Sequence, residues 1–278
     1  MSVSGHPEGY VDPEEVPIPD VSGLITEDDT PVDNVYSEKQ MRLLTEPLYA
    51  SWTPPDGRPF FLAANVGVFA RPSNDALVPD VFLSLDTAPK TPYHLKQNRS
   101  YFVWEHGKPP DVVVEVVSNR EGDELTRKLR GYERMRVVHY VVYDPERQLS
   151  DLEVCRFELQ GGVLVAAEGP LRLPSLDLGL TRWPGTFEQQ DSHWLRWCRL
   201  DGTIIPTGAE RASTAEERAS TAEERASTAE ERASTAEERA STAEERASTA
   251  EERASTAEER AARLEAKLRE LGLDPETT

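Results

Sequence analysis

Residues 110–145 read PDVVVEVVSNREGDELTRKLRGYERMRVVHYVVYDP. An apolar, β-branched run carries one acid, Glu115, in its middle, and a basic amphipathic segment and a second apolar run follow it. Proline before the first run and SNREGD after it mark the bounds of a buried strand. A charged side chain inside a buried strand is unfavourable unless a metal ion or a partner charge compensates it. Glu115 is therefore the first candidate for a functional residue.

A second apolar run has the same character, because Asp80 follows Pro79 and precedes VFLSL. The segment after Glu115 predicts a helix that carries Lys128. Mg²⁺ is a hard cation that binds one or two carboxylates together with water and substrate phosphate. A bound metal ion activates a water molecule for attack on a phosphodiester, and a nearby lysine can orient that water. The sequence therefore predicts the site of a metal-dependent nuclease, with Asp80 and Glu115 as metal ligands and Lys128 as their catalytic partner.

Each of these three residues also has a purely structural interpretation. Asp80 could simply begin a strand after a turn, and Lys128 could be an exposed helix charge. Glu115 could form a buried salt bridge with Lys128 or Arg127. The arginines on and before the helix could hold a phosphate backbone or could form a solvated face. These arginines are Arg120, Arg127, Arg130, Arg134 and Arg136.

The pattern of the whole body predicts a mixed α/β fold, with a mixed sheet and helices packed on it. One helix is expected over residues 37–49 with Ser37 as its N-cap, and another over residues 124–136 with Asp123 as its N-cap. The last two strands should form a hairpin through Gly161 and Gly162. The predicted strands are residues 60–70, 79–86, 100–104, 111–117, 139–143, 151–159 and 163–167.

The formal charge of -20 is concentrated in the two ends of the chain. Residues 1–46 hold 11 acids and 2 bases, and residues 210–278 hold 19 acids and 11 bases. The remaining body has 21 acids and 18 bases and is close to neutral. Global charge is therefore only a weak argument against a nucleic-acid substrate, since a local basic patch would still attract phosphates.

Other classes of site lack a signal in the sequence. The 2 cysteines make neither a disulfide framework nor a zinc site, and the 5 histidines form no metal-binding pair at helical spacing. No dinucleotide, P-loop or GxSxG motif is present. No signal peptide or membrane span is visible, which favours a cytoplasmic protein that does not enter a membrane.

The C-terminal part is built from a perfect repeat. The unit RASTAEE occurs seven times over residues 211–259, and Leu264, Leu268 and Leu271 continue its register. Alanines at 3,4 spacing predict a long heptad helix, on the order of 95 Å at 1.5 Å per residue. Within the repeat, no glutamate has an arginine three or four residues away. In a parallel, in-register pair, Arg218 would face Glu223 of the other helix, whereas an antiparallel pair would set like charges against each other. The pattern therefore favours a parallel coiled-coil homodimer over an antiparallel one, and a solitary helix is the open alternative.

Several of these segments together resemble a known family. VPDVFLSLD with Asp80, PDVVVEVVS with Glu115, DELTRKLRGYERMRV and YVVYDP are similar to the Uma-two family of restriction endonucleases, a branch of the PD-(D/E)xK nuclease superfamily. The resemblance covers about residues 36–207. It implies a restriction-endonuclease-like fold, Mg²⁺-dependent cleavage of DNA (with Mn²⁺ as a possible substitute), and Asp80 and Glu115 as the two acids of the superfamily pattern.

One position departs from that pattern. The superfamily lysine normally stands two residues after the second acid, where this chain has Val117. The resemblance then implies that Lys128 serves as a lysine relocated to the following helix. An acid on the first helix often assists in the superfamily, and Glu38 and Glu46 are both candidates for that role.

These observations lead to two hypotheses from different classes. The first is a Mg²⁺-dependent DNA endonuclease, whose chemistry would be shared by an RNA nuclease. The alternative is a catalytically silent nuclease-like module that oligomerises through its coiled coil. The expected organisation is a disordered acidic arm (1–34), a nuclease-like domain (35–207), a heptad-repeat helix (208–272) and a short tail (273–278).

Overall fold

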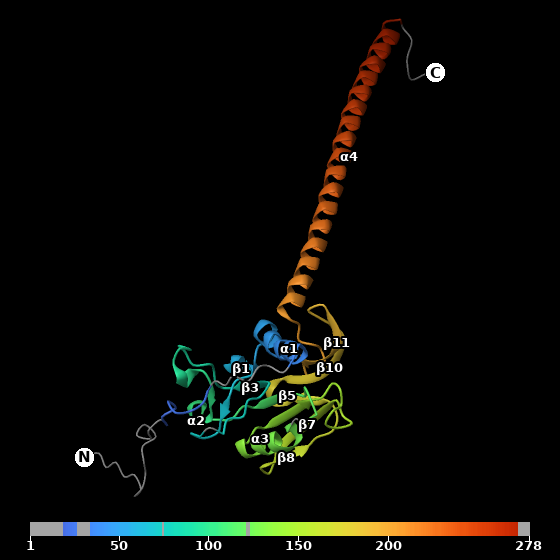
Figure 1. The fold of residues 1–278 in the computed structure, drawn as a ribbon. Coiled ribbons are helices and arrows are strands. Elements are labelled where there is room, and N and C mark those ends of the chain that lie inside the picture. The colour runs from blue at the N-terminus through green and yellow to red at the C-terminus, as the bar shows by residue number, and fades with distance from the viewer. Residues whose placement is uncertain (1–18, 27–33, 74, 121–122, 272–278) are drawn as a thin grey trace, which may run out of the picture. The chain divides into compact units, whose positions relative to one another are not determined.

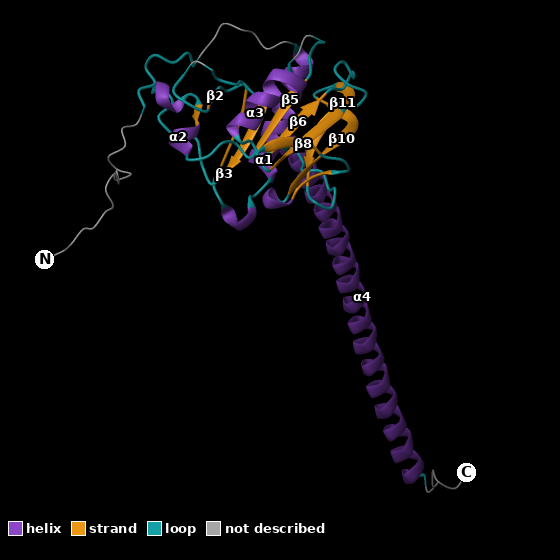
Figure 2. Ribbon diagram, turned by 90° about the horizontal axis from the view of Figure 1, so that it is seen from below, coloured by secondary structure: helices purple, strands orange, loops and turns teal. Residues whose placement is uncertain are grey.

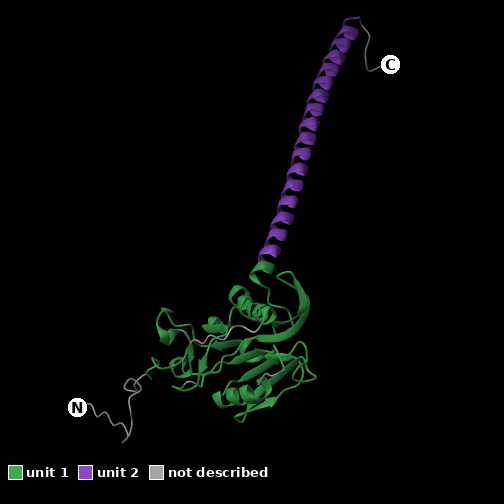
Figure 3. Ribbon diagram, in the orientation of Figure 1, with its two compact units in different colours: residues 1–211 green, residues 212–278 purple. Residues whose placement is uncertain are grey.

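The computed structural model describes residues 19–26, 34–73, 75–120 and 123–271. The chain divides into two compact units, residues 1–211 and residues 212–278 (Figure 3). The first unit holds the sheets and the candidate site. The second consists of the greater part of one long helix.

The main sheet of the first unit has six strands in the order β1-β3-β5-β6-β7-β8, and Figure 2 shows them in orange. β5 and β6 are parallel, and the other neighbours are antiparallel, so the predicted mixed sheet is confirmed. A parallel pair needs a crossover connection, which the segment between β5 and β6 provides. The strands are β1 (Phe60–Ala64), β3 (Val81–Leu85), β5 (Val112–Val116), β6 (His139–Tyr143), β7 (Val154–Gln160) and β8 (Val163–Ala166).

The two faces of this sheet are covered by different helices (Figure 1). Alternate residues of β5 point to opposite faces. Val112, Val114 and Val116 join one hydrophobic cluster with residues of α1 (Val35–Ser51). Val113 and Val117 join the other cluster, with Tyr132 and Met135 from the α3 region. Glu115 has the parity of Val113 and therefore belongs to the α3 face.

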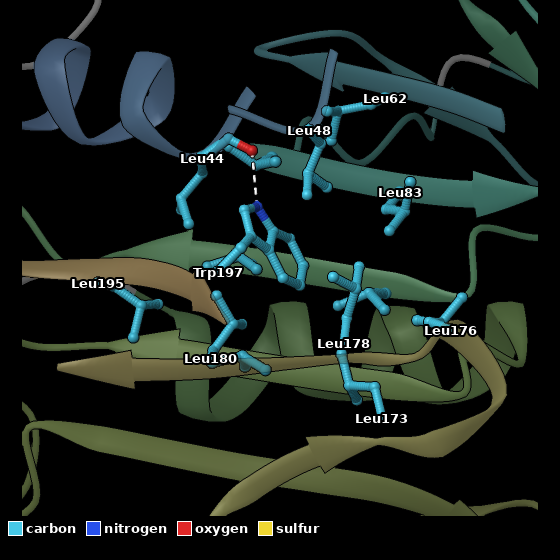
Figure 4. Packing of buried hydrophobic residues seen from close by; sticks show 14 of the residues in the cluster. Leu44, Leu48, Leu62, Leu83, Leu173, Leu176, Leu178, Leu180, Leu195 and Trp197 are labelled. Atoms are coloured by element: carbon cyan, nitrogen blue, oxygen red, sulfur yellow. Dashed lines mark hydrogen bonds between the residues drawn. The ribbon is translucent and has the colours of Figure 1, made fainter. Parts of the chain in front are cut away.

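A second sheet, which the sequence analysis did not predict, packs on the α1 side. Its order is β11-β10-β9, with β9 (Leu171–Leu173), β10 (Leu178–Phe187) and β11 (Gln190–Cys198). The indole nitrogen of Trp197 donates a hydrogen bond of 2.7 Å to the carbonyl of Leu44 on α1 (Figure 4). Leucines from β9, β10 and β11 belong to the same buried cluster as this ring, together with residues of α1 and of the main sheet.

The predicted strand over residues 60–70 is interrupted. Asn65 has a positive φ of 54°, which ends β1 and lets β2 (Val68–Phe69) leave the main sheet. β2 pairs in parallel with β4 (Tyr101–Phe102), and α2 (Val103–His106) replaces the end of the strand predicted at 100–104. Val21 and Leu24 pack on this small sheet although they lie in the predicted disordered arm, most of which is outside the described residues.

The predicted N-cap of the first helix, Ser37, is wrong, whereas Asp123 does occupy the N-cap position of the second, without a side-chain capping bond. α1 begins two residues earlier than expected, and the Asn34 side chain accepts the capping bond from the Ser37 amide at 2.8 Å. Asp123 makes no side-chain cap, and the helix predicted at 124–136 is a π-helical turn, η4 (Glu124–Lys128), followed by α3 (Leu129–Met135). Short 3₁₀ turns are η2 (Pro55–Gly57), η3 (Lys96–Asn98) and η5 (Pro174–Leu176).

The repeat segment forms one helix, α4 (Gly208–Glu270), which confirms the prediction of a long helix. The residues of its seven repeats are exposed in the single chain, and no Glu–Arg ion pair forms within these repeats, all of which the structure describes. None of the helices in the described residues combines the length and the apolar character needed to cross a lipid bilayer.

Candidate active site

Asp80 and Glu115 meet across neighbouring strands. Val81 of β3 pairs with Val114 of β5 in an antiparallel register, so the residue before β3 stands opposite Glu115. Directly opposite residues in such a pair have Cβ atoms about 4.5–5.5 Å apart. The amide of Val116 donates a 2.6 Å hydrogen bond to Oδ2 of Asp80, which holds this carboxylate beside β5.

Glu115 is completely buried, and two side chains from the crossover segment bind its two oxygens. The Tyr132 hydroxyl donates to Oε1 at 2.7 Å, and the Lys128 ammonium donates to Oε2 at 2.9 Å. Each carboxylate oxygen therefore has a partner, as a buried charge requires. The expected salt bridge with Lys128 is present, whereas Arg127 pairs with Asp123.

The π-helical turn brings a third acid to the same place. The amide of Lys128 bonds to the carbonyl of Asp123, five residues back, at 3.0 Å. Such single wide turns are rare and occur frequently at functional sites. Across this turn, Oε1 of Glu124 lies 3.4 Å from the Lys128 ammonium. Glu124 is 8% exposed, and its Oε2 is buried with no hydrogen-bond partner in the described part of the chain.

Burial and mutual repulsion dominate the electrostatics of the acids. Burial, and then the neighbouring Asp80 carboxylate, raise the pKa of Glu115 to about 8. Burial likewise raises the pKa of Asp80 above its usual value. For Lys128, burial acts to lower the pKa, but attraction to Glu115 and Glu124 outweighs it and the pKa is raised. Lys128 therefore stays charged, while Glu115 holds a proton near neutral pH more readily than an ordinary glutamate.

The composition of this cluster fits a hard divalent cation. Three carboxylates, Asp80, Glu115 and Glu124, surround one ammonium group, so full ionisation leaves two negative charges uncompensated. Although these three acids lie near the same lysine, no three His, Cys, Asp or Glu side chains in the described parts of the chain are placed to bind one metal ion together. Two protein carboxylates completed by water is a usual environment of Mg²⁺, so Asp80 and Glu115 fit this ion.

The structure thus brings Asp80, Glu115 and Lys128 together at one position on the α3 face. Sequence reasoning missed Glu124 and Tyr132 as members of this cluster. Their spacing from Lys128, four residues before and four after, is a signal that could have identified them, because residues four apart share one helix face.

Comparison with known families bears directly on this cluster. The family model of Uma2 (Uma-two), described as "Putative restriction endonuclease", matches residues 13–183. The match covers more than half of the chain and includes all three predicted site residues. The chain belongs to the Uma2 family. No curated protein matches it.

The two acids on the first helix lie away from the cluster in this Uma2 protein. Glu38 pairs with Arg42 on α1 at 2.6 Å. Glu46 accepts a 2.8 Å hydrogen bond from the Gly208 amide. Because α1 covers the face of the sheet opposite Glu115, neither acid is positioned to assist there in the way the resemblance implied.

Three arginines line a groove beside the α3 region in this Uma2 protein. The groove has a volume of about 610 Å³ and runs between the α3 region and residues 70–71 and 75–77. Its basic residues are Arg71, Arg127 and Arg134. Arg71 pairs with Asp75 and Arg127 with Asp123, whereas Arg134 is exposed and has no ion-pair partner among the described residues.

The other two arginines of the helix have different partners. Arg130 pairs with Glu133 at 3.1 Å, and Arg136 donates to the carbonyl of Gly162 at 2.9 Å. Of the five arginines of the predicted basic face, Arg127 and Arg134 line the groove.

Proposed function

We propose that this Uma2 protein is a Mg²⁺-dependent endonuclease that hydrolyses phosphodiester bonds in DNA. The observation that carries the proposal is the buried Glu115 carboxylate with Asp80 opposite it and the Lys128 ammonium 2.9 Å away. Perturbed titratable groups in such an arrangement are typical of active sites. A purified sample assayed on DNA and RNA with Mg²⁺, Mn²⁺ or EDTA tests this function, and the expected result is metal-dependent cleavage of DNA that EDTA abolishes.

In this proposal each residue of the cluster has one task. Asp80 and Glu115 would hold the metal ion, which when bound supplies an acidic water and stabilises negative charge on the phosphate. Lys128 would orient the attacking water by hydrogen bonding. Val117 occupies the usual lysine position and packs in the hydrophobic cluster of the α3 face. The ammonium of Lys128 nevertheless reaches Glu115 from η4, which supports a relocated lysine.

Metal binding should depend strongly on pH. A carboxyl group must lose its proton to bind a cation, and the pKa of Glu115 is raised to about 8. Affinity for Mg²⁺ should therefore rise with pH and level off above about 8, with a loss of roughly tenfold for each pH unit below it. Isothermal titration calorimetry with Mg²⁺ at pH 6, 7, 8 and 9 measures this slope. An affinity that does not change over this range would contradict the role of Glu115.

The groove lined by Arg71, Arg127 and Arg134 would contact the DNA backbone. Replacing Arg134 with Glu should weaken DNA binding on all sequences and reduce the salt slope of log K by about 1, as loss of one phosphate contact does. Arg130→Glu is the matched control, because Arg130 lies on the same helix outside the groove. Equal effects of the two variants in fluorescence anisotropy titrations at several salt concentrations would argue against the groove.

The alternative function is a catalytically silent module. It is favoured by Val117, which stands at the usual lysine position, and by the long repeat helix α4. Under either function we propose that α4 makes a parallel homodimer, because the Arg and Glu side chains of its seven repeats form no ion pairs with one another, although the structure describes all of these residues. Sedimentation equilibrium of the full chain should give twice the chain mass. Replacing the seven repeat arginines with Glu sets Glu against Glu, so this variant should be monomeric. A monomeric wild-type chain would refute the coiled coil.

Calorimetry separates the two functions, since a silent module need not bind Mg²⁺. A cytoplasmic location would suit either function, and the two thiols agree with it. Cys155 and Cys198 are both free, and Cys198 is buried.

A further inference from the structure

Glu124 is a buried acid whose hydrogen bonding is incomplete. One oxygen faces the Lys128 ammonium at 3.4 Å, a long contact, and the other has no partner among the described residues. A buried carboxylate oxygen without a hydrogen bond is unfavourable, and native structures contain few of them. The backbone of Glu124 is also held in place, because the buried Tyr140 hydroxyl on β6 donates a 2.8 Å hydrogen bond to the Glu124 carbonyl.

The competing partner of Lys128 is Glu115, which binds the same ammonium group more closely, at 2.9 Å. If Glu115 gives its oxygens to a cation, Lys128 loses its better partner. Glu124 is then the carboxylate that remains within reach, and its unused oxygen gives it capacity for a second bond. An ammonium group left without a partner would be free to move away from the reacting water.

We infer that Glu124 is a positioning residue, which holds the Lys128 ammonium group in place when Glu115 binds a metal ion. This inference rests on the proposed function. Glu124 acts through Lys128 and is not itself a metal ligand. The wide turn η4 serves this role, because it sets Glu124 and Lys128 on one face above Glu115.

The test measures Mn²⁺ affinity of the full chain by calorimetry at pH 8.5, where Glu115 is mostly ionised. Glu124→Gln should weaken Mn²⁺ binding on the order of tenfold, because Lys128 then loses its alternative carboxylate partner and competes more strongly with the ion for Glu115. The matched control is Asp123→Asn, which removes the same charge one residue away from a carboxylate that pairs with Arg127. The control should change the affinity little.

A double-mutant cycle shows whether Glu124 acts through Lys128. In a Lys128→Met background, Glu124→Gln should have no further effect on Mn²⁺ affinity. The same tenfold loss in that background would make Glu124 a direct ligand and overturn the inference, as would equal effects of Glu124→Gln and Asp123→Asn. In cleavage assays, Glu124→Gln should lower kcat and leave KM for DNA unchanged.

Melting curves and a second variant distinguish the positioning role of Glu124 from a purely structural role. Glu124→Asp keeps the charge with a shorter reach and should recover part of the Mn²⁺ affinity, whatever its effect on Tm. The inference would be overturned if the Mn²⁺ affinity of the variants changed in parallel with their Tm and did not depend on the charge at position 124. Wild-type protein that binds no Mn²⁺ would refute the proposed function itself, a result distinct from failure of Glu124 alone.

Discussion

Replacing Glu115 with Gln should abolish metal-stimulated cleavage, with a loss on the order of a hundredfold or more, the scale seen when a preorganised electrostatic contact is removed. Glutamine has the same shape and keeps an acceptor for the Tyr132 hydroxyl, but it is a poor ligand for a hard cation. The fold should persist, because the substitution removes a buried group whose pKa is raised to about 8 by burial and the Asp80 charge. Cleavage rates in Mg²⁺ and a melting curve measure the two effects.

The control for this variant is Glu158→Gln. Glu158 also lies on a strand of the main sheet, but it pairs with Arg156 at 2.7 Å on β7 and has no contact with the cluster. The Glu158→Gln variant should cleave DNA at the wild-type rate. Full activity of Glu115→Gln would refute the assignment of Glu115, whatever the control shows.

Replacing Lys128 with Met should separate metal binding from catalysis. Methionine removes the ammonium group that competes with a cation for the Glu115 oxygens, so Mn²⁺ affinity should be kept or increased. Cleavage should fall on the order of a hundredfold to a thousandfold, the scale seen when one preorganised hydrogen-bond donor is removed. Calorimetry and cleavage rates on the same sample give this pair of results.

Lys39→Met serves as the control, because Lys39 lies on α1 and pairs with Glu188 at 2.8 Å. It should change neither quantity. If Lys128→Met cleaves at the wild-type rate, no lysine is needed for catalysis, since Val117 already replaces the lysine of the superfamily pattern. If it loses Mn²⁺ binding, Lys128 supports the metal ligands and does not act on water.

The sequence predicted those elements whose boundaries are marked by composition. β6 has the predicted bounds, His139–Tyr143, because an apolar run ends at DPERQ. The hairpin of β7 and β8 follows from Gly161 and Gly162, which both adopt the positive φ that the turn needs. The second sheet was missed because β10 contains Pro184 and Gly185, residues that argue against a strand.

The site was predictable in its main residues and not in its geometry. Strand parity places Asp80 and Glu115 each on a definite face, but only the register of β3 against β5 sets them opposite each other. The sequence could not show the π-helical turn, since the pattern of residues 124–136 suits an ordinary helix. That turn sets the local backbone between Glu124 and Lys128, although the spacing of four residues between these two side chains was already visible in the sequence.

The central claim is that Asp80 and Glu115 share one divalent ion within reach of Lys128. A crystal structure of the protein grown with Mn²⁺, measured for anomalous scattering, tests it most directly. The account predicts one strong anomalous peak between the Asp80 and Glu115 carboxylates on the α3 face. Crystals at saturating Mn²⁺ with no peak at these two residues, or with the peak bound elsewhere, would contradict it.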